Sequence, residues 1–376
     1  MKRLFSLILV FCMICSFGVL LSGCGYTYAD LDLRAEYTKE FAGTTLNVYN
    51  WGEYISDGSD DSIDTIKEFE HITGIKVNYS TFDSNETMYS QIKNGGVSYD
   101  IIIPSDYMIE RLINEDMLLK LDRSKLTNFD LIDNKYKGLY FDPKDEYTAA
   151  YCVGMVGLIY NTKKVKEAPD SWHVLWDRKY KDDILMFNNP RDAFAIAQFM
   201  LEQDLNSTNK KDWDKAAELL KKQKKYLQSY VMDEVYGKME TGEAALAPYY
   251  AGDFLTMWEN NDDLAFVYPK EGTNIFVDSA CIPKNAQNYE AALMFINFLM
   301  EPDIALANAE YIGYASPNTA VVNNENYYYY GNKILYPDEA DMPKTQYFHN
   351  IDKDIRLILR FCRLLIARSR NVHSAI

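Results

Sequence analysis

The sequence LNVYN (residues 46–50) opens the stretch that decides the fold. Apolar and polar residues alternate along it, as in a strand with one buried face. Apolar residues then recur at helical spacing from Ile63 to Ile72, and Gly74 is a stop signal for that helix. The pattern continues with a strand at 75–79, a helix at 87–93, a buried β-branched strand at 101–103 and a helix at 108–115. This β-α-β-α-β-α order predicts a parallel sheet covered by helices.

A second α/β unit begins near Gly154. Its pattern predicts strands at 155–160 and 184–187 and helices at 192–202 and 211–225. Near Asp278 the pattern returns to a strand, and a helix at 289–300 follows. About 330 residues follow residue 43, which is enough for two domains with cores of their own.

The N-terminus carries the signals of export. Lys2 and Arg3 precede an apolar run that ends in small residues, which is the layout of a secretory signal. The tetrapeptide LSGC (residues 21–24) resembles the bacterial lipobox, in which the cysteine is lipidated. We therefore expect a lipoprotein signal peptide at 1–23, a lipid anchor on Cys24 and a polar tether at 24–43. The protein would then be extracytoplasmic and held at the membrane, on the cell surface or in the periplasm.

The remaining cysteines predict neither a disulfide framework nor a metal site. Two of the six cysteines lie in the signal and one is Cys24, so an odd number is left without any CxxC spacing: Cys152, Cys281 and Cys362. The histidines are equally scattered, and no metal or other cofactor is expected.

Composition favours a cationic partner. The net charge is −16, or −18 once Lys2 and Arg3 are removed with the signal. Such a field repels nucleic acid and anions and attracts cations. Aromatic residues make up 14% of the chain, with 30 Tyr, and aromatic faces hold organic cations. The sequence contains no GxSxG, HExxH or GxxxxGK[ST] motif, so an enzyme is not expected.

Several motifs together resemble the spermidine/putrescine-binding proteins of bacterial import systems. They occur in the family's order from residue 44 to about 350. These motifs are YNWGEY (49–54), YSTFDSNETMY (79–89), Asp100 with PSDY (104–107), NPRDAF (189–194), YPKEG (268–272), DS (278–279) and IGYASPN (312–318).

The resemblance implies the type II periplasmic-binding-protein fold, in which two α/β lobes close over a ligand. Lobe 1 would comprise 44–152 and 279–322, and lobe 2 would comprise 153–278 and 323–376. The implied partners are a polyamine, the permease subunits of an ABC importer and, through the lipid anchor, the membrane. We expect the protein to act as a monomer.

A polyamine site needs carboxylates at both ends and flat apolar walls between them. An unpaired ammonium in a closed cleft is very costly, and aromatic faces attract cations while covering methylene groups. The expected ligand-binding residues, which follow strands at the sheet edge or match family positions, are Trp51, Glu53, Tyr54, Ser105, Tyr107, Asn189, Asp192, Tyr250, Phe276, Asp278, Tyr314 and Gln346.

Three of these positions depart from the family pattern. Asn189 stands where spermidine-binding members carry an aspartate, which removes a counter-charge and predicts a weaker preference for the triamine. Tyr250 and Phe276 each replace a tryptophan that is common in relatives. A choline-like or betaine-like ligand is the alternative, but a quaternary ammonium needs aromatic walls and no pair of flanking acids.

The C-terminal segment fits the resemblance poorly. From Ile355 to Ile376 the chain has five arginines and no acids. One interpretation is an amphipathic closing helix whose arginine stems cover apolar surface. The other is a shifted reading frame near the end of the gene.

Overall fold

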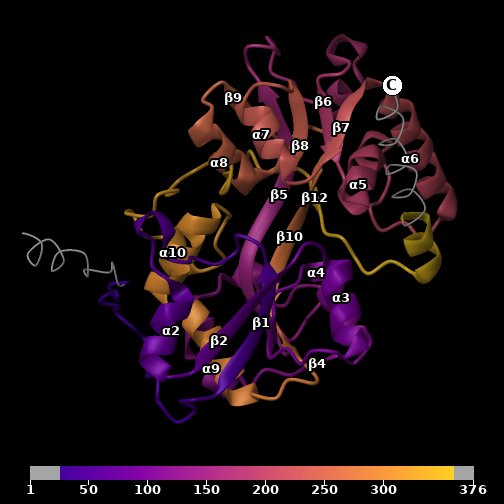
Figure 1. The fold of residues 1–376 in the computed structure, drawn as a ribbon. Helices are drawn as coiled ribbons and strands as arrows, with labels where there is room; N and C mark the ends of the chain where they lie inside the picture. The colour runs from indigo at the N-terminus through magenta and orange to yellow at the C-terminus, as the bar shows by residue number, and fades with distance from the viewer. Residues whose placement is uncertain (1–25, 360–376) are drawn as a thin grey trace, which may run out of the picture.

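The computed structural model describes residues 26–359 and shows two α/β lobes, one above the other in Figure 1. The predicted signal peptide, Cys24 and the basic segment from residue 360 onward lie outside the described residues. No helix in residues 26–359 combines the length and apolar character that crossing a membrane requires.

The first lobe is built on the parallel sheet that the sequence predicts, and its strands lie in the order β2-β1-β3. Helices α2, α9 and α10 pack together beside it, and the ring of Phe69 in α2 lies 4.8 Å from that of Phe295 in α9. Two separate stretches of chain therefore share one core. Its elements are β1 (Thr45–Trp51), α2 (Thr65–Thr73), β2 (Lys76–Phe82), α3 (Asn85–Asn94), β3 (Ile101–Ile102), α4 (Asp106–Asn114), β4 (Leu118–Leu119), β11 (Ile282–Pro283), α9 (Tyr289–Leu299), α10 (Pro302–Ile312) and α11 (Thr319–Val322).

Local signals fix the ends of the early helices. The side chains of Asp64 and Ser84 accept hydrogen bonds from backbone N–H groups in the first turns of α2 and α3. Gly74 and Gly95 end these helices with φ angles of 72° and 67°, the left-handed conformation that glycine adopts most readily. These caps place the first turn of α3 beside the carboxyl edge of the sheet.

The second lobe contains a mixed sheet in the order β12-β10-β5-β8-β6-β7, with β9 also paired to β5. Helix α5 packs against α6 on this lobe, and Phe194 in α5 contacts Trp213 in α6 with ring centroids 5.6 Å apart. Its elements are β5 (Ala149–Asn161), β6 (Ile184–Phe187), α5 (Pro190–Met200), α6 (Lys210–Gln223), β7 (Leu227–Val231), α7 (Glu234–Glu240), β8 (Leu246–Tyr250), α8 (Ala251–Asn260), β9 (Leu264–Val267), β10 (Thr273–Ala280) and β12 (Thr345–Gln346).

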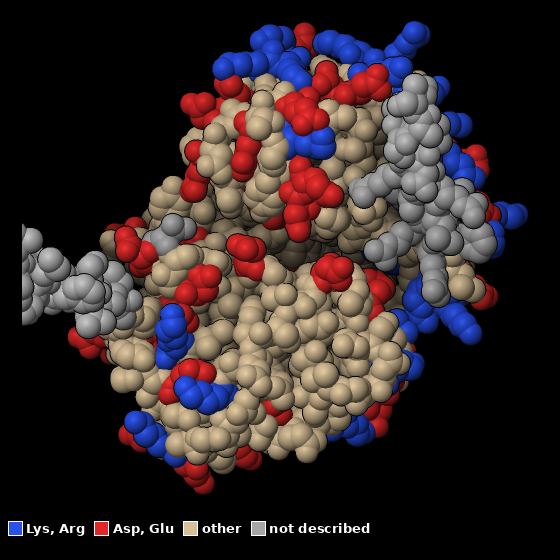
Figure 2. Space-filling view, viewed as in Figure 1, with Lys and Arg blue, Asp and Glu red and all other residues tan. Residues whose placement is uncertain are grey.

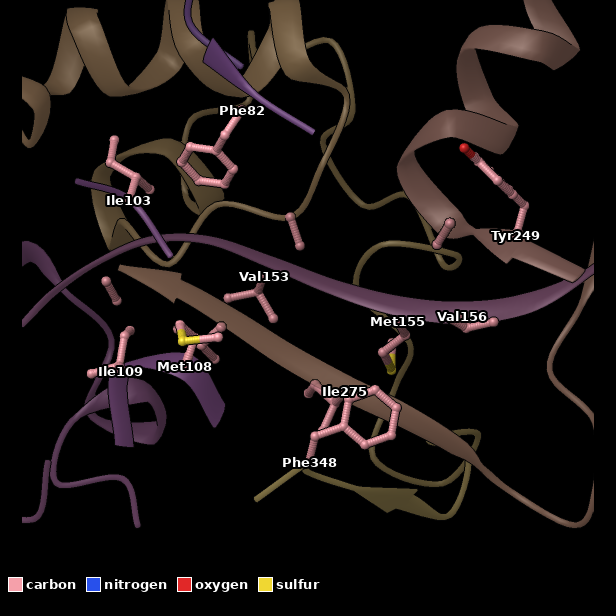
Figure 3. Packing of buried hydrophobic residues seen from close by; sticks show 14 of the residues in the cluster. Phe82, Ile103, Met108, Ile109, Val153, Met155, Val156, Tyr249, Ile275 and Phe348 are labelled. Atoms are coloured by element: carbon pink, nitrogen blue, oxygen red, sulfur yellow. The ribbon is translucent and has the colours of Figure 1, made fainter. Parts of the chain in front are cut away.

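Two long strands join the lobes. β5 and β10 run antiparallel to each other from the lower lobe into the upper one (Figure 1). Their pairing shifts register between Asp278 and Ser279, close to the lobe boundaries that the sequence predicts. Val153 and Met155 of β5 and Ile275 of β10 lie within one continuous hydrophobic cluster that reaches into both lobes (Figure 3). The two strands are therefore held by hydrophobic packing where they pass from one lobe to the other, and β10 places Asp278 between the lobes.

The segment before β1 is not the free tether that its polar composition suggests. Residues 26–43 lie along the first lobe and give backbone hydrogen bonds to buried carboxylates. The N–H of Ala29 donates to Glu68, and that of Arg34 donates to Glu301, at 2.6 and 2.7 Å. These contacts join residues far apart in sequence, which a search for apolar periodicity does not detect.

The C-terminal segment contacts both lobes, so assigning all of 323–376 to lobe 2 is too simple. Residues 345–346 form β12 on the edge of the second sheet, beside β10. However, the N–H of Asn350 donates to Glu110 in α4 of the first lobe, at 2.6 Å. The chain is helical again from residue 353 to the end of the described residues.

Candidate functional site

One group of predicted residues surrounds Asp278 on β10. The hydroxyl of Tyr54 donates to Oδ2 of Asp278 at 2.7 Å, and the backbone of Ser105 forms an isolated bridge with Asp278. Oδ1 of Asp278 is buried and has no hydrogen-bond partner in the described part of the chain. Burial raises the pKa of Asp278 to about 6. The nearby side chains of Ser105 and Tyr54 oppose this rise, so the described chain compensates the carboxylate only in part.

A second group surrounds Asp192 in the first turn of α5. The hydroxyl of Tyr250, at the end of β8, donates to Oδ2 of Asp192 at 2.8 Å. Asp192 is only 3% exposed, and burial raises its pKa to about 7. The two groups thus have the same construction, a buried aspartate held by one tyrosine hydroxyl.

Aromatic rings connect the two groups. The ring of Tyr250 lies 5.6 Å from that of Phe276, Phe276 lies 6.1 Å from Tyr314, and Tyr314 lies 5.8 Å from Tyr54. Each step joins neighbouring centroids at the distance typical of aromatic pairs. Four rings therefore form a continuous wall with a carboxylate at each end.

Ser105 and Tyr107 are held in place by a residue that sequence reasoning did not assign. The buried amide of Asn85 donates to the hydroxyl oxygens of Ser105 and Tyr107, at 3.1 and 3.2 Å, and accepts from the N–H of Ser105. Asn85 opens α3 within the motif YSTFDSNETMY, so the signal was present, but its role depends on contacts across the loop after β3.

Tyr314 is also positioned by residues that the sequence analysis missed. Its hydroxyl donates to Asp253 in α8, and the hydroxyl of Tyr236 donates to the other oxygen of that carboxylate at 2.5 Å. A Cβ on Gly252 would lie 2.4 Å from the Tyr314 ring, so only glycine leaves room for it. Tyr314 is therefore fixed by the second lobe although it follows α10 of the first.

Four predicted residues have other contacts. Trp51 packs its ring against Phe82 at 4.5 Å, and Glu53 is exposed on the loop after β1 with a φ of 54°. The side-chain oxygen of Asn189 caps α5 by accepting from the N–H of Arg191, and Oε1 of Gln346 accepts from the N–H of Leu205. Within the described residues, none of these four side chains bonds to the carboxylate of Asp192 or Asp278, and their roles in ligand binding stay predictions.

The surface agrees with a site for cations. Figure 2 shows a hollow between the two lobes with Asp and Glu side chains on both of its edges. On this face Lys and Arg side chains are most numerous around the top of the upper lobe and along the right-hand edge. Acidic side chains along these edges produce a negative electrostatic potential in the hollow, which attracts cations toward it.

Comparison with known proteins places this architecture in a family. Residues 64–332 match the family of bacterial extracellular solute-binding proteins. The chain belongs to this family. Among solved structures of such solute-binding proteins, the spermidine/putrescine ABC transporter substrate-binding protein PotD from Streptococcus pneumoniae is similar to this chain. The TM-score is 0.73 and the identity 34%, and the likeness covers 86% of this chain and 99% of that one.

Curated solute-binding proteins show the same likeness. The spermidine/putrescine-binding periplasmic protein of Salmonella typhimurium is 35% identical over 309 residues, which are 82% of this chain and 87% of that protein. The putrescine-binding periplasmic protein PotF of Escherichia coli is 30% identical over 299 residues, 73% of this chain and 78% of the other. The sequence-based prediction of family and two-lobed fold is therefore confirmed.

Proposed function

We propose that this chain captures a polyamine, putrescine or spermidine, outside the cytoplasm and delivers it to the permease subunits of an ABC importer. The observation that carries the proposal is the aromatic wall from Tyr250 to Tyr54 with Asp192 at one end and Asp278 at the other. The names of the relatives, which are spermidine/putrescine-binding and putrescine-binding periplasmic proteins, support it.

The chemistry of a linear polyamine matches this arrangement. Each end carries an ammonium, which needs an anionic partner when it leaves water. Asp278 offers a buried oxygen that no group in the described chain occupies. The methylene chain between the ammonium groups needs apolar contact, and aromatic faces supply both that contact and attraction for the cations. One ligand can therefore satisfy both aspartates at once.

A choline-like or betaine-like ligand is the weaker alternative. A quaternary ammonium centre has no N–H to donate to a carboxylate, so it cannot pair with the Oδ1 atom of Asp278 as a primary ammonium does. It also has a single cationic centre, whereas the wall ends in two acids. The aromatic rings alone fit both classes of ligand, and the paired acids favour the diamine.

We also propose that Cys24 is lipidated and anchors the protein at the outer face of the cell membrane. The relatives are periplasmic proteins, which supports an extracytoplasmic location. Replacing Cys24 with Ala should release the protein from membranes or leave it unprocessed. Fractionation of cells, with globomycin to block lipoprotein processing, tests the anchor; processing that is insensitive to globomycin would contradict it.

Calorimetric titration with putrescine, spermidine, spermine and choline tests the proposed ligand. We expect saturable binding of putrescine or spermidine at one site per chain and much weaker binding of choline. Tight binding of choline together with no response to any polyamine would overturn the proposal.

A further inference from the structure

The aromatic wall has a third carboxylate next to its middle. Tyr314 is the third of the four rings and lies between Phe276 at 6.1 Å and Tyr54 at 5.8 Å. Its hydroxyl donates to Asp253, in the first turn of α8. The two aspartates already assigned to the ligand stand at the ends of the wall, so Asp253 adds a negative charge between them.

The contacts of Asp253 are more specific than the start of a helix requires. An acid in the first turn of a helix is stabilised by the helix dipole, and this effect needs no tyrosine. The hydroxyl of Tyr236 nevertheless donates to Oδ1 of Asp253 at 2.5 Å, and that of Tyr314 donates to Oδ2. The Tyr314 ring also packs on Gly252, where a Cβ would lie 2.4 Å from it. The ring and its hydroxyl are therefore both held at the start of α8.

The charge of Asp253 is not neutralised by a cation of the described chain. No Lys, Arg or His nitrogen of residues 26–359 lies within 4 Å of its carboxylate. Burial raises the pKa of Asp253, and the hydroxyls of Tyr236 and Tyr314 oppose this rise. An ammonium beside Tyr314 would favour the ionised form further, because an opposite charge within about 4–6 Å stabilises it.

The bond to Asp253 also decides what the Tyr314 hydroxyl can offer a ligand. Its single proton is directed at the carboxylate, so only lone pairs of the oxygen are left for another group. An oxygen in this state accepts a hydrogen bond and cannot donate one, which suits an N–H of an ammonium. Two successive hydrogen bonds would place the Asp253 oxygen about 5 Å from that nitrogen.

We propose that Asp253, acting through the Tyr314 hydroxyl, is a specificity-determining residue that compensates the internal ammonium of a triamine such as spermidine. The inference rests on the proposed polyamine function. Asp192 and Asp278 pair with the terminal ammonium groups, and the Tyr314–Asp253 pair meets the charge between them. This pair supplies a counter-charge in a chain whose residue at position 189 is the neutral Asn189.

A comparison of spermidine with 1,8-diaminooctane tests the assignment. The two ligands have the same number of chain atoms between their terminal nitrogens, and the diamine has a methylene group in place of the internal ammonium. In calorimetry, Asp253→Asn should weaken spermidine binding about tenfold, as for loss of one nearby charge, and should change the affinity for 1,8-diaminooctane less than about threefold.

Asp212→Asn is the matched control for this substitution. Asp212 is the third residue of α6, as Asp253 is of α8, and its carboxylate also accepts from a hydroxyl, that of Ser207 at 2.7 Å. Helix α6 lies on the opposite side of the upper lobe from α8 (Figure 1). The control variant should bind both ligands as the wild type does.

Tyr314→Phe tests whether Asp253 acts through the hydroxyl. This substitution keeps the ring of the wall and should also lower the preference for spermidine. Adding Asp253→Asn to Tyr314→Phe should then reduce the preference clearly less than it does in the wild type, because the two residues act as one pair. Additive losses would show that Asp253 acts independently of Tyr314 and would overturn the inference.

The outcomes separate this inference from the proposed function. If the wild type binds neither spermidine nor putrescine, the function itself is refuted. If the wild type binds spermidine and Asp253→Asn leaves the ratio of the two affinities unchanged, Asp253 serves the fold alone and the inference fails while the function stands. Thermal unfolding shows whether each variant is folded; if Asp253→Asn is not, Tyr314→Phe decides, and an unchanged ratio in that variant overturns the inference.

Discussion

Two regions of this molecule bury carboxylates and treat them differently. Glu301, under the N-terminal segment, is fully buried and accepts hydrogen bonds from the N–H groups of Arg34 and Ala35, the hydroxyl of Tyr37 and the amide of Asn128. Asp278, in the cleft, is almost as buried, yet its Oδ1 has no partner in the described chain. A carboxylate that serves the fold is saturated by its own chain, whereas the one in the cleft retains capacity for a ligand.

The largest effect that follows from this contrast is on binding. Asp278→Asn and Asp192→Asn should each weaken polyamine binding by about 3–5 kcal/mol, because each leaves an ammonium buried without its partner. The unfolding temperature without ligand should not fall, since neither substitution removes a saturated carboxylate. Titration and thermal unfolding measure the two quantities, and binding within threefold of the wild type would remove that acid from the site.

Removing the charge of Glu301 should lower the stability of the fold and leave ligand binding unchanged. Glu301→Gln should lower the free energy of unfolding by about 2 kcal/mol, because an amide cannot accept all four hydrogen bonds and charge-assisted bonds are lost. Its affinity for putrescine should match the wild type. Denaturant unfolding checks the first point. If this variant instead unfolded like the wild type and bound poorly, the distinction between the two regions would be wrong.

A smaller effect should appear in the pH dependence. Burial raises the pKa of Asp192 to about 7 and that of Asp278 to about 6, above the ordinary value of about 3.9. Without ligand the folded state then binds more protons than the unfolded state between about pH 4 and 7, so its stability should fall as the pH rises through that range. An ammonium favours the ionised acids, so affinity should rise over the same range. Thermal unfolding with and without ligand, and calorimetric titration, each at pH 5.5 and 8, measure the two trends. If the stability changed with pH in the same way with and without ligand, both expectations would be contradicted.

Local signals in the sequence explain which parts of the fold were predicted correctly. The alternation at 46–50, the buried run at 101–103 and the stop at Gly74 each act over a few residues, and the structure has the corresponding strands and helix end. The docking of residues 26–43 was not predicted, because it depends on backbone bonds to carboxylates far along the chain.

For the candidate site too, local motifs were predictive and contacts between distant segments were not. The family motifs indicated Tyr54, Asp192 and Asp278, and the structure holds each aspartate with a tyrosine hydroxyl. The supporting residues Asn85 and Asp253 were missed, since their roles arise from contacts between separate elements. The cap formed by Asn189 was readable from the Asn-Pro pair that starts α5, a common start of a helix.

The most direct test of the two-ended cleft compares putrescine with butylamine, which has the same carbon chain and a single ammonium. Calorimetry on the wild type, Asp192→Asn and Asp278→Asn gives the ratio of the two affinities for each protein. The account predicts that the wild type prefers putrescine by about a hundredfold or more, and that each substitution removes most of this preference, because an ammonium then lacks its acid. Equal affinity of the wild type for both ligands, or a preference that survives both substitutions, would contradict it.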